Sequence, residues 1–180
     1  NCWERVVQTG VIEKDNIEFI HPDLSPIETS LAELDDIIAK YAHASSAIND
    51  LLQRLKGYAQ QDNPRSILFT GNPGVGKTRI AEIYGMMVKK LHNHDDAPSI
   101  TFDCGQFYNK NGPYQLFGDP NGVFEGGVKT EGIVFSVGRG VLILDEFGEI
   151  RESEEGSFSN LLNPSTRTYQ RAGEDKPRKV

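Results

Sequence analysis

The sequence contains little cysteine, no long apolar run and no excess of basic residues. Its two cysteines, Cys2 and Cys104, are too few for a disulfide framework, which indicates a reducing compartment such as the cytoplasm. No apolar run approaches the roughly 18–20 residues that cross a bilayer, and the first residues lack the order of a secretory signal. Lys and Arg total 19 against 26 Asp and Glu, a formal net charge of −7. We therefore expect a cytoplasmic protein with no membrane partner, and no direct nucleic-acid binding by this segment.

The spacing of apolar residues predicts alternating helices and strands. Helical periodicity is present in three segments, 30–41, 48–58 and 77–92. Short apolar runs typical of buried strands are present at 66–70, 100–104 and 141–144. Together they predict an α/β fold, a mostly parallel sheet covered by helices on both faces in three layers. Within it we expect an N-terminal linker and helix over residues 1–43 and one core domain over residues 44–180.

A glycine-rich segment joins the predicted strand 66–70 to the predicted helix 77–92. It reads Gly71-Asn72-Pro73-Gly74-Val75-Gly76-Lys77-Thr78 and matches the phosphate-binding pattern G-x-x-x-x-G-K-[ST]. Glycines let backbone N–H groups converge on phosphate oxygens, and the start of the next helix adds its positive dipole end. Lys77 can reach the β and γ phosphates of ATP, and the Thr78 hydroxyl can bind Mg²⁺. A glycine-rich turn with an incidental lysine is the alternative, but the complete pattern favours a P-loop NTPase sheet.

The apolar run 141–144 ends on two carboxylates, Asp145 and Glu146. Ligands of open α/β sheets bind beyond the carboxyl ends of the strands, so Asp145 and Lys77 are predicted to converge there. Asp145 would bind Mg²⁺, directly or through water, and Glu146 would act as general base on the attacking water. An acidic surface loop is the alternative, because more glutamates follow. Combined with the phosphate-binding segment, the pair predicts an ATPase whose catalytic residues are Glu146 and Lys77.

Four further stretches match the motifs of a single family. They read Phe102-Asp103-Cys104, Leu116-Phe117-Gly118, Gly122-Val123-Phe124-Glu125-Gly126-Gly127 and Leu144-Asp145-Glu146-Phe147-Gly148-Glu149-Ile150. With the phosphate-binding segment they resemble an AAA+ ATPase domain, most closely the central domain of bacterial enhancer-binding proteins, which activate sigma-54 RNA polymerase. The corresponding family motifs are V-N-C, L-F-G, G-A-F-T-G-A and L-D-E-I-G-E-L, and the resemblance extends back to about Ser45.

The resemblance implies an ATPase that assembles into a homo-oligomeric ring and uses ATP hydrolysis to remodel a protein partner. The family's loop at 122–127 grips the sigma factor, which makes Val123, Phe124 and Glu125 the candidate partner contacts. Glu125 replaces a threonine of the family, so a charge stands where a small hydroxyl is usual. The family's asparagine at the position of Asp103 restrains the catalytic glutamate, which makes Asp103 a possible switch, although it cannot donate the amide hydrogen bond.

The resemblance also predicts a chain that is a fragment lacking the lid. Val180 stands where the family places its next strand, followed by a sensor residue, arginine fingers and a helical lid. In AAA+ domains that strand lies between the strands predicted at 66–70 and 141–144. Without it both neighbours would expose unpaired backbone groups in the middle of a sheet.

Other interpretations remain open beside this one. A Clp-like unfoldase is compatible with Gly118-Asp119-Pro120-Asn121-Gly122 and Gly126-Gly127, and so is a nucleotide-controlled binding module with little hydrolysis. His92-Asn93-His94-Asp95-Asp96 fits a solvated loop better than a metal site. Cys104 is expected to be buried and inert. One group of cations is either a solvated surface or a contact with a neighbouring subunit: Arg167, Arg171, Lys176, Arg178 and Lys179.

Overall fold

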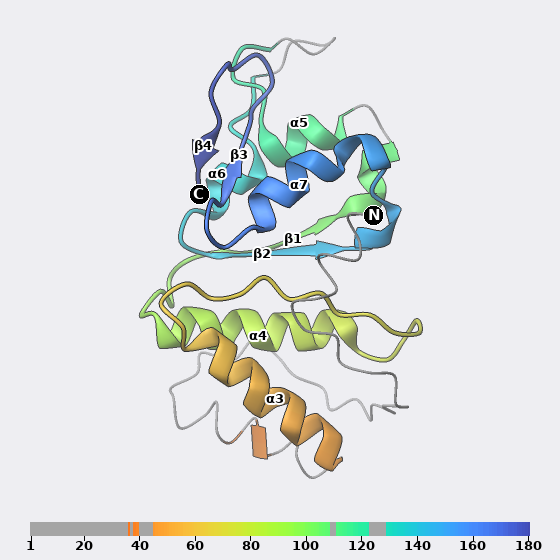
Figure 1. Ribbon diagram of the computed structural model, residues 1–180, viewed down its shortest axis with the longest axis vertical. Helices are drawn as coiled ribbons and strands as arrows, with labels where there is room; N and C mark the ends of the chain where they lie inside the picture. Colours follow the sequence, from red (N-terminus) through yellow and green to blue (C-terminus); the bar gives the residue numbers. More distant parts are fainter. Residues whose placement is uncertain (1–35, 37, 40–44, 109–110, 123–128) are drawn as a thin grey trace. The chain divides into compact units, whose positions relative to one another are not determined.

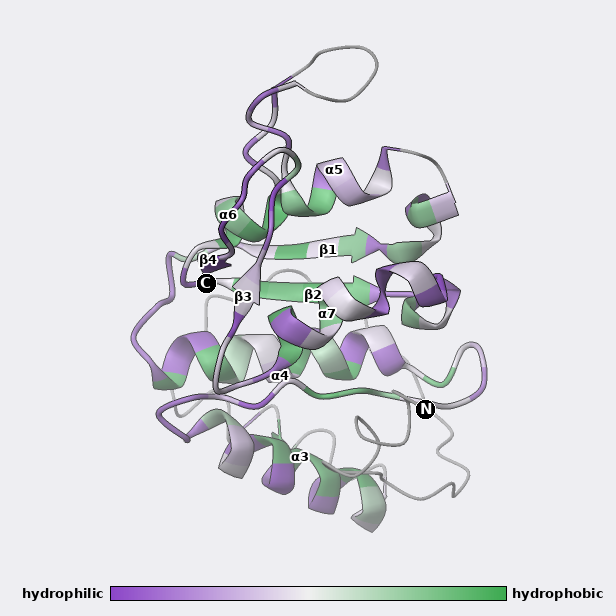
Figure 2. Cartoon of the chain, turned by 45° about the horizontal axis from the view of Figure 1, so that its top comes forward, coloured by the Kyte–Doolittle hydropathy of each residue, from purple (hydrophilic) through white to green (hydrophobic). Residues whose placement is uncertain are grey.

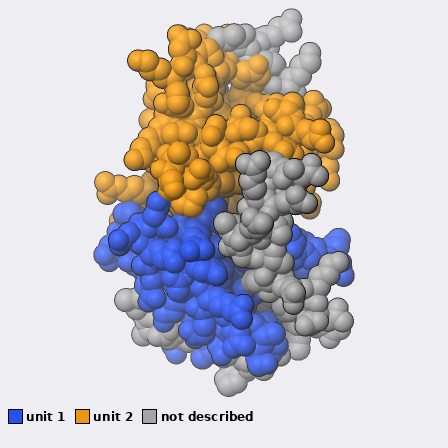
Figure 3. All heavy atoms as spheres, viewed as in Figure 1, with its two compact units in different colours: residues 1–95 blue, residues 96–180 orange. Residues whose placement is uncertain are grey.

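The computed structural model describes residues 36, 38, 39, 45–108, 111–122 and 129–180 (Figure 1). The chain divides into two compact units, residues 1–95 (unit 1) and residues 96–180 (unit 2), which are coloured separately in Figure 3. Each unit encloses a hydrophobic core of its own.

Unit 1 is built on two helices whose apolar stripes form its core. Helix α3 (Ser46–Ala59) begins after Ser45, whose hydroxyl accepts a hydrogen bond from the Ala47 amide at 3.1 Å. Helix α4 spans Lys77–Leu91. Both helices confirm the predicted periodicity, and Ile38 from the predicted helix 30–41 joins their core. Most of that first helix lies outside the described residues. The buried residues of the two helices include Ile48, Leu51, Leu52, Leu55, Ile80, Ile83, Tyr84 and Met87.

The predicted strand 66–70 is wrong, because this segment belongs to no strand in the structure. A strand needs a neighbour that pairs with its backbone, and the parallel sheet of the described residues contains only β1 (Ser99–Asp103) and β2 (Val141–Asp145). Tertiary contacts hold the segment instead. Ile67 and Phe69 pack on the core of unit 1, and the Tyr84 hydroxyl donates to the Arg65 carbonyl at 2.8 Å. The segment therefore leads into residues 71–78 without ladder hydrogen bonds.

Unit 2 contains the predicted parallel pair of strands, β1 (Ser99–Asp103) and β2 (Val141–Asp145). The register pairs Ser99 with Val141 and Asp103 with Asp145, so both strands end on a carboxylate at the same edge. Strand β2 is hydrophobic over most of its length (Figure 2). The α/β class with a parallel sheet is therefore confirmed.

One face of this sheet is covered by helices α5 (Gly112–Phe117), α6 (Ile133–Val137) and α7 (Glu155–Leu162) (Figure 1). Phe158 of α7 is the aromatic centre of this core, with its ring centroid 5.3 Å from that of Phe107, 5.4 Å from that of Phe147 and 5.5 Å from that of Phe117. These aromatic contacts attach the turns that follow β1 and β2 to α7. The remaining elements of unit 2 are η1 (Cys104–Tyr108), η2 (Phe147–Glu149), η3 (Glu152–Glu154), β3 (Thr168–Tyr169) and β4 (Arg178–Lys179).

Candidate functional site

The predicted phosphate-binding segment 71–78 forms a turn, exposed over residues 71–74, that leads into α4, whose first two residues are Lys77 and Thr78. Gly74 and Gly76 have φ values of 80° and 85°, a backbone conformation that disfavours residues with a side chain. Gly76 is the N-cap of α4 and offers no side-chain cap, and the first turn contains no acidic residue. The positive end of the α4 dipole is therefore not neutralised by a carboxylate within the first turn of the helix. This environment suits a phosphate anion.

Lys77 lies over this turn and donates its ammonium hydrogens to the turn's own backbone. Its Nζ is 3.2 Å from the carbonyl oxygen of Gly71 and 3.2 Å from that of Asn72. Thr78, the next residue, is half-buried in the first turn of α4. An ammonium, a hydroxyl and backbone amides in one short segment are the groups that bind a nucleotide's phosphates and their Mg²⁺.

The predicted acidic pair lies at the carboxyl end of β2. The Asp145 Oδ1 accepts a hydrogen bond from the Glu146 amide at 3.0 Å. Glu146 itself has φ 49° and ψ 39°, a left-handed conformation that few non-glycine residues adopt. Its side chain is exposed, and that of Asp145 is half-buried. A half-buried carboxylate at this strand end provides the hard oxygen ligand that Mg²⁺ prefers, and the exposed carboxylate next to it can accept a proton from water.

Asp103 ends β1 beside this pair, in register with Asp145. Its Oδ1 accepts a hydrogen bond from the Gly105 amide at 2.8 Å, so the carboxylate caps its own turn. Cys104, the next residue, is fully buried, as predicted. Burial, followed by the charges of Asp103 and Asp145, raises the pKa of its thiol to about 12, which keeps the sulfur protonated and unreactive.

The structure brings together one part of the predicted site within a single unit. Asp103, Asp145 and Glu146 gather at the carboxyl ends of β1 and β2 in unit 2. The segment 71–78 belongs to unit 1, and its predicted convergence with Asp145 stays a prediction. Gly122 is the one described residue of the predicted partner loop 122–127, and Val123, Phe124 and Glu125 lie outside the described residues.

Sequence reasoning missed an ionic cluster in unit 2 that is centred on the buried Arg171 and also contains Glu131, Glu174 and Arg178. Arg171 is only 5% exposed and donates to Glu131 Oε2 and, at 2.8 Å, to Glu174 Oε1. Arg178 donates to both oxygens of Glu174, at 2.8 and 2.9 Å. Glu174 stands three residues after Arg171 and four before Arg178, and that charge spacing was the available signal.

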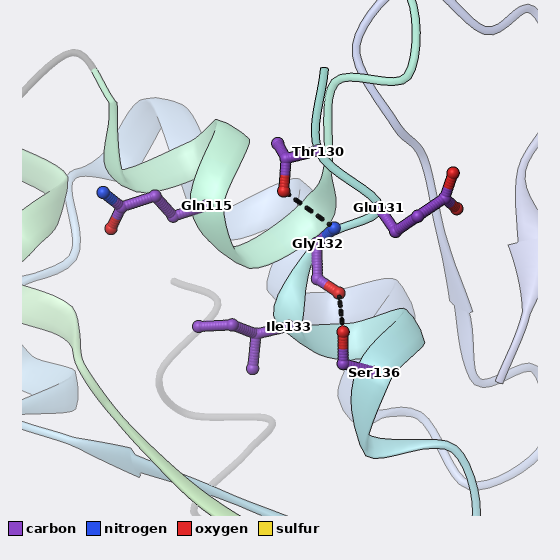
Figure 4. Close-up of a pocket in the computed structure, with 6 residues that line it drawn as sticks. All are labelled: Gln115, Thr130, Glu131, Gly132, Ile133 and Ser136. Carbon is purple, nitrogen blue, oxygen red and sulfur yellow. Dashed lines mark hydrogen bonds between the residues drawn. The ribbon is translucent and has the colours of Figure 1, made fainter. Parts of the chain in front are cut away.

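Glu131 also lines a pocket of about 290 Å³ beside α5 and α6 (Figure 4). The Gly132 amide donates to Thr130 Oγ1 at 3.3 Å, and the Ser136 hydroxyl donates to the Gly132 carbonyl at 3.0 Å. The pocket is lined by Gln115, Thr130, Glu131, Gly132, Ile133 and Ser136, and none of these is a predicted nucleotide-binding residue.

In the segment 92–96 the structure shows a structural role for one histidine. His92 Nε2 lies 2.8 Å from the carbonyl oxygen of Ala59, which joins the C-terminal ends of α3 and α4. Among the described residues, no group of three or more potential metal-binding side chains gathers around one point. Within the same residues, no helix has both the length and the apolar character needed to cross a membrane.

Comparison with known proteins identifies the class to which this arrangement belongs. Residues 41–180 match the family described as the Sigma-54 interaction domain. The chain therefore belongs to the sigma-54 interaction domain family, which has the AAA+ P-loop fold, and the resemblance inferred from the sequence is confirmed.

Individual relatives agree with this assignment. An uncharacterized protein in the HyuA 5′ region of Pseudomonas sp. (strain NS671) is 32% identical over 122 residues, covering 66% of this chain and 39% of the relative. The DNA-binding transcriptional activator HyfR of Escherichia coli (strain K12) is 29% identical over 114 residues, covering 63% of this chain and 16% of HyfR. The transcriptional regulatory protein GlrR of the same organism is 32% identical over 101 residues, covering 56% of this chain and 21% of GlrR. The chain thus spans well under half the length of these relatives.

A solved structure supports the fold. The crystal structure of NtrX from Brucella abortus matches with a TM-score of 0.58 at 21% sequence identity, covering 83% of this chain and 32% of that chain. At this level of identity the likeness concerns the fold alone.

Proposed function

We propose that residues 44–180 are the ATPase core of a sigma-54-type transcription activator, which binds Mg-ATP and hydrolyses it in a homo-oligomeric ring to remodel a protein partner. One observation carries this proposal: within a family match over residues 41–180, the segment 71–78 has the glycine conformations, the uncapped helix start and the lysine that phosphate binding requires. HyfR and GlrR are themselves described as transcriptional regulators.

The chemistry assigned to each residue follows from its side chain and its place in the fold. The backbone N–H groups of residues 71–76 other than Pro73, together with the ammonium of Lys77, bind the phosphates and neutralise charge that develops on the transferred group. Thr78 and Asp145 would hold Mg²⁺, which would supply Lewis-acid polarisation of the phosphate oxygens. The exposed carboxylate of Glu146 accepts a proton from the attacking water.

The partner contact is assigned to the loop 122–127, on the basis of the motif alone. Phe124 would provide the apolar contact and Glu125 a negative charge, so the partner surface that it meets should be basic. We propose the sigma-54 form of RNA polymerase as this partner because the whole domain belongs to the family named for that interaction.

Two substitutions in the full-length protein test the ATPase assignment. Lys77→Ala should weaken ATP binding at least about tenfold, because a charge-assisted contact to phosphate is lost. Glu146→Gln should leave ATP binding unchanged and lower kcat at least about a hundredfold, because an amide cannot accept the proton. Binding is measured by titration calorimetry and turnover by phosphate release.

Two exposed residues provide matched controls, Lys176→Ala for the lysine and Glu152→Gln for the carboxylate. Both control variants should bind and hydrolyse ATP like the wild type. Normal turnover by either Lys77→Ala or Glu146→Gln would exclude the assignment.

A further inference from the structure

The turns that follow β1 and β2 both pack against one buried side chain, that of Phe158. Phe107 of η1 and Phe147 of η2 both pack against Phe158, with ring centroids 5.3 and 5.4 Å from that of Phe158. The first turn follows Asp103, and the second follows Asp145 and Glu146. Packing against Phe158 therefore places the two turns side by side, next to the proposed catalytic carboxylate of Glu146.

A second, polar set of contacts joins exposed residues at the ends of the same two turns. The Tyr108 hydroxyl donates to Glu149 Oε2 at 3.0 Å. Arg151 donates from Nη2 to the Tyr108 carbonyl at 3.2 Å, and its guanidinium lies 5.5 Å from the centroid of the Tyr108 ring. Tyr108 is 59% exposed, so burial of its ring in the core does not explain its position. The hydrogen bond to Glu149 raises the pKa of Tyr108, since the carboxylate favours the protonated hydroxyl.

These contacts act on the backbone that presents Glu146. The Glu149 amide donates to the Glu146 carbonyl at 2.9 Å, so Glu149 closes the turn that begins at Glu146. Glu146 is held in the left-handed region, a conformation that is strained for a residue with a side chain. Such a conformation persists where the surrounding contacts enforce it.

The side chain of Glu146 has no comparable restraint. Among the described residues, no hydrogen bond or ion pair involves its carboxylate, and Asp103 caps the turn at Gly105 instead. The direction of the Glu146 side chain therefore depends on the backbone of its turn.

We propose that Tyr108, acting through Glu149 and Arg151, is a positioning residue that holds the Glu146 turn in its hydrolytic orientation. This inference rests on the proposed function, because it assumes that Glu146 activates the attacking water. Tyr108 itself touches neither water nor nucleotide in this scheme. It restrains the catalytic carboxylate from the end of η1, the turn that follows Asp103 at the end of β1.

The first test is Tyr108→Phe in the full-length protein, which removes the hydroxyl and keeps the ring beneath Arg151. We expect kcat for ATP hydrolysis to fall about three- to tenfold, in line with the loss of one exposed hydrogen bond, while KM and the Kd for ATP stay unchanged. Glu149→Ala should have the same effect. Glu149→Gln should retain most of the activity, because its amide oxygen still accepts from Tyr108.

The matched control is Tyr58→Phe on α3, where Arg65 lies 5.3 Å from the ring centroid of Tyr58 in the same kind of cation–π contact. This control should leave kcat unchanged. A kcat of Tyr108→Phe equal to that of the wild type, or equal losses in kcat and in ATP affinity, would overturn the positioning role.

Hydrogen exchange of the nucleotide-free protein tests the restraint without any turnover. The amides of residues 146–150 should exchange several-fold faster in Tyr108→Phe than in the wild type or in Tyr58→Phe. Unchanged exchange refutes the restraint, whatever the activity. A wild-type protein that fails to bind or hydrolyse ATP contradicts the proposed function instead, so the two failures are distinguishable.

Discussion

Arg171 illustrates how the environment of one residue decides what its charge does. Its guanidinium is buried between Glu131 and Glu174, and hydrogen bonds to these carboxylates raise its pKa, so it stays charged at any accessible pH. The same segment meets the base of the loop 122–127, because the Ala172 amide donates to the Gly118 carbonyl at 3.1 Å and Asn121 donates to the Gly173 carbonyl at 3.2 Å. One of the two interpretations left open for the basic group, a solvated surface, is therefore wrong for Arg171, and the contact with a neighbouring subunit stays a prediction.

Replacing Arg171 with alanine should therefore destabilise the protein. Two carboxylates would lose their shared cation, but Glu131 is 58% exposed and can be hydrated, so we expect about 2 kcal/mol rather than the roughly 3–5 kcal/mol of a fully buried pair. Denaturant unfolding measures this difference. Lys176→Ala, an exposed cation of the same segment, should change the free energy of unfolding by less than about 0.5 kcal/mol.

Glu174 gives the cluster a defined dependence on pH. Hydrogen bonds from Arg178 and then Arg171 lower its pKa from 4.5 to about 2. Because the folded pKa is depressed, the stabilisation is complete above pH 4.5 and is lost as the pH falls toward 2. In wild type the unfolding midpoint should fall over this range by more than in Glu174→Gln. Parallel curves for the two proteins would contradict this prediction.

At the level of elements, glycines whose backbone conformation is left-handed constrain the packing of α5 against α6. Gly132, the N-cap of α6, has φ 85°, and a Cβ there would lie 2.5 Å from the Gly118 nitrogen. Because the obstructing atoms are backbone, they cannot rotate away. The start of α6 can therefore approach Gly118 only without a side chain.

Gly132→Ala should therefore lower stability by at least about 2 kcal/mol, through backbone strain together with the clash. Gly57→Ala provides the contrast, because Gly57 lies in the exposed part of α3 with no atom within 4 Å of a built Cβ. That change should raise stability by about 0.5–1 kcal/mol through helix propensity. Thermal unfolding of both variants measures the two opposite shifts.

The elements also show where local pattern suffices. Helices α3 and α4 were predicted because an apolar stripe at helical spacing lies within one segment. Strands β1 and β2 were predicted from short apolar runs, and each of them finds a partner in the other. Residues 66–70 carry an equally apolar run but form no strand, because strand formation depends on a partner elsewhere in the chain.

At the scale of the whole molecule, the proposed function requires two segments far apart in the sequence to act on one nucleotide. Lys77 belongs to unit 1 and Asp145 to unit 2. If both bind the same Mg-ATP, the affinity for ATP should no longer depend on Mg²⁺ once Asp145 is removed.

In wild type, chelation of Mg²⁺ with EDTA should weaken ATP binding, whereas in Asp145→Ala the binding should already be weak and insensitive to EDTA. We expect the wild-type affinity to fall at least about tenfold on chelation, by loss of the metal bridge. Fluorescence titration with a labelled ATP measures both effects. A magnesium dependence that survives in Asp145→Ala would show that Asp145 does not bind the metal.

The sequence by itself determined the features that depend on neighbouring residues. These are the two helices of unit 1, the two strands of unit 2, the burial of Cys104 and the family to which the chain belongs, since spacing and short motifs are local properties. The tertiary structure alone decided which charges are buried, that residues 66–70 form no strand, and that Tyr108 contacts Glu149. Each of these outcomes depends on segments that are distant in sequence. Burial by such a segment, or a hydrogen bond with it, has a larger effect on the free energy of a polar group than its neighbours in sequence have.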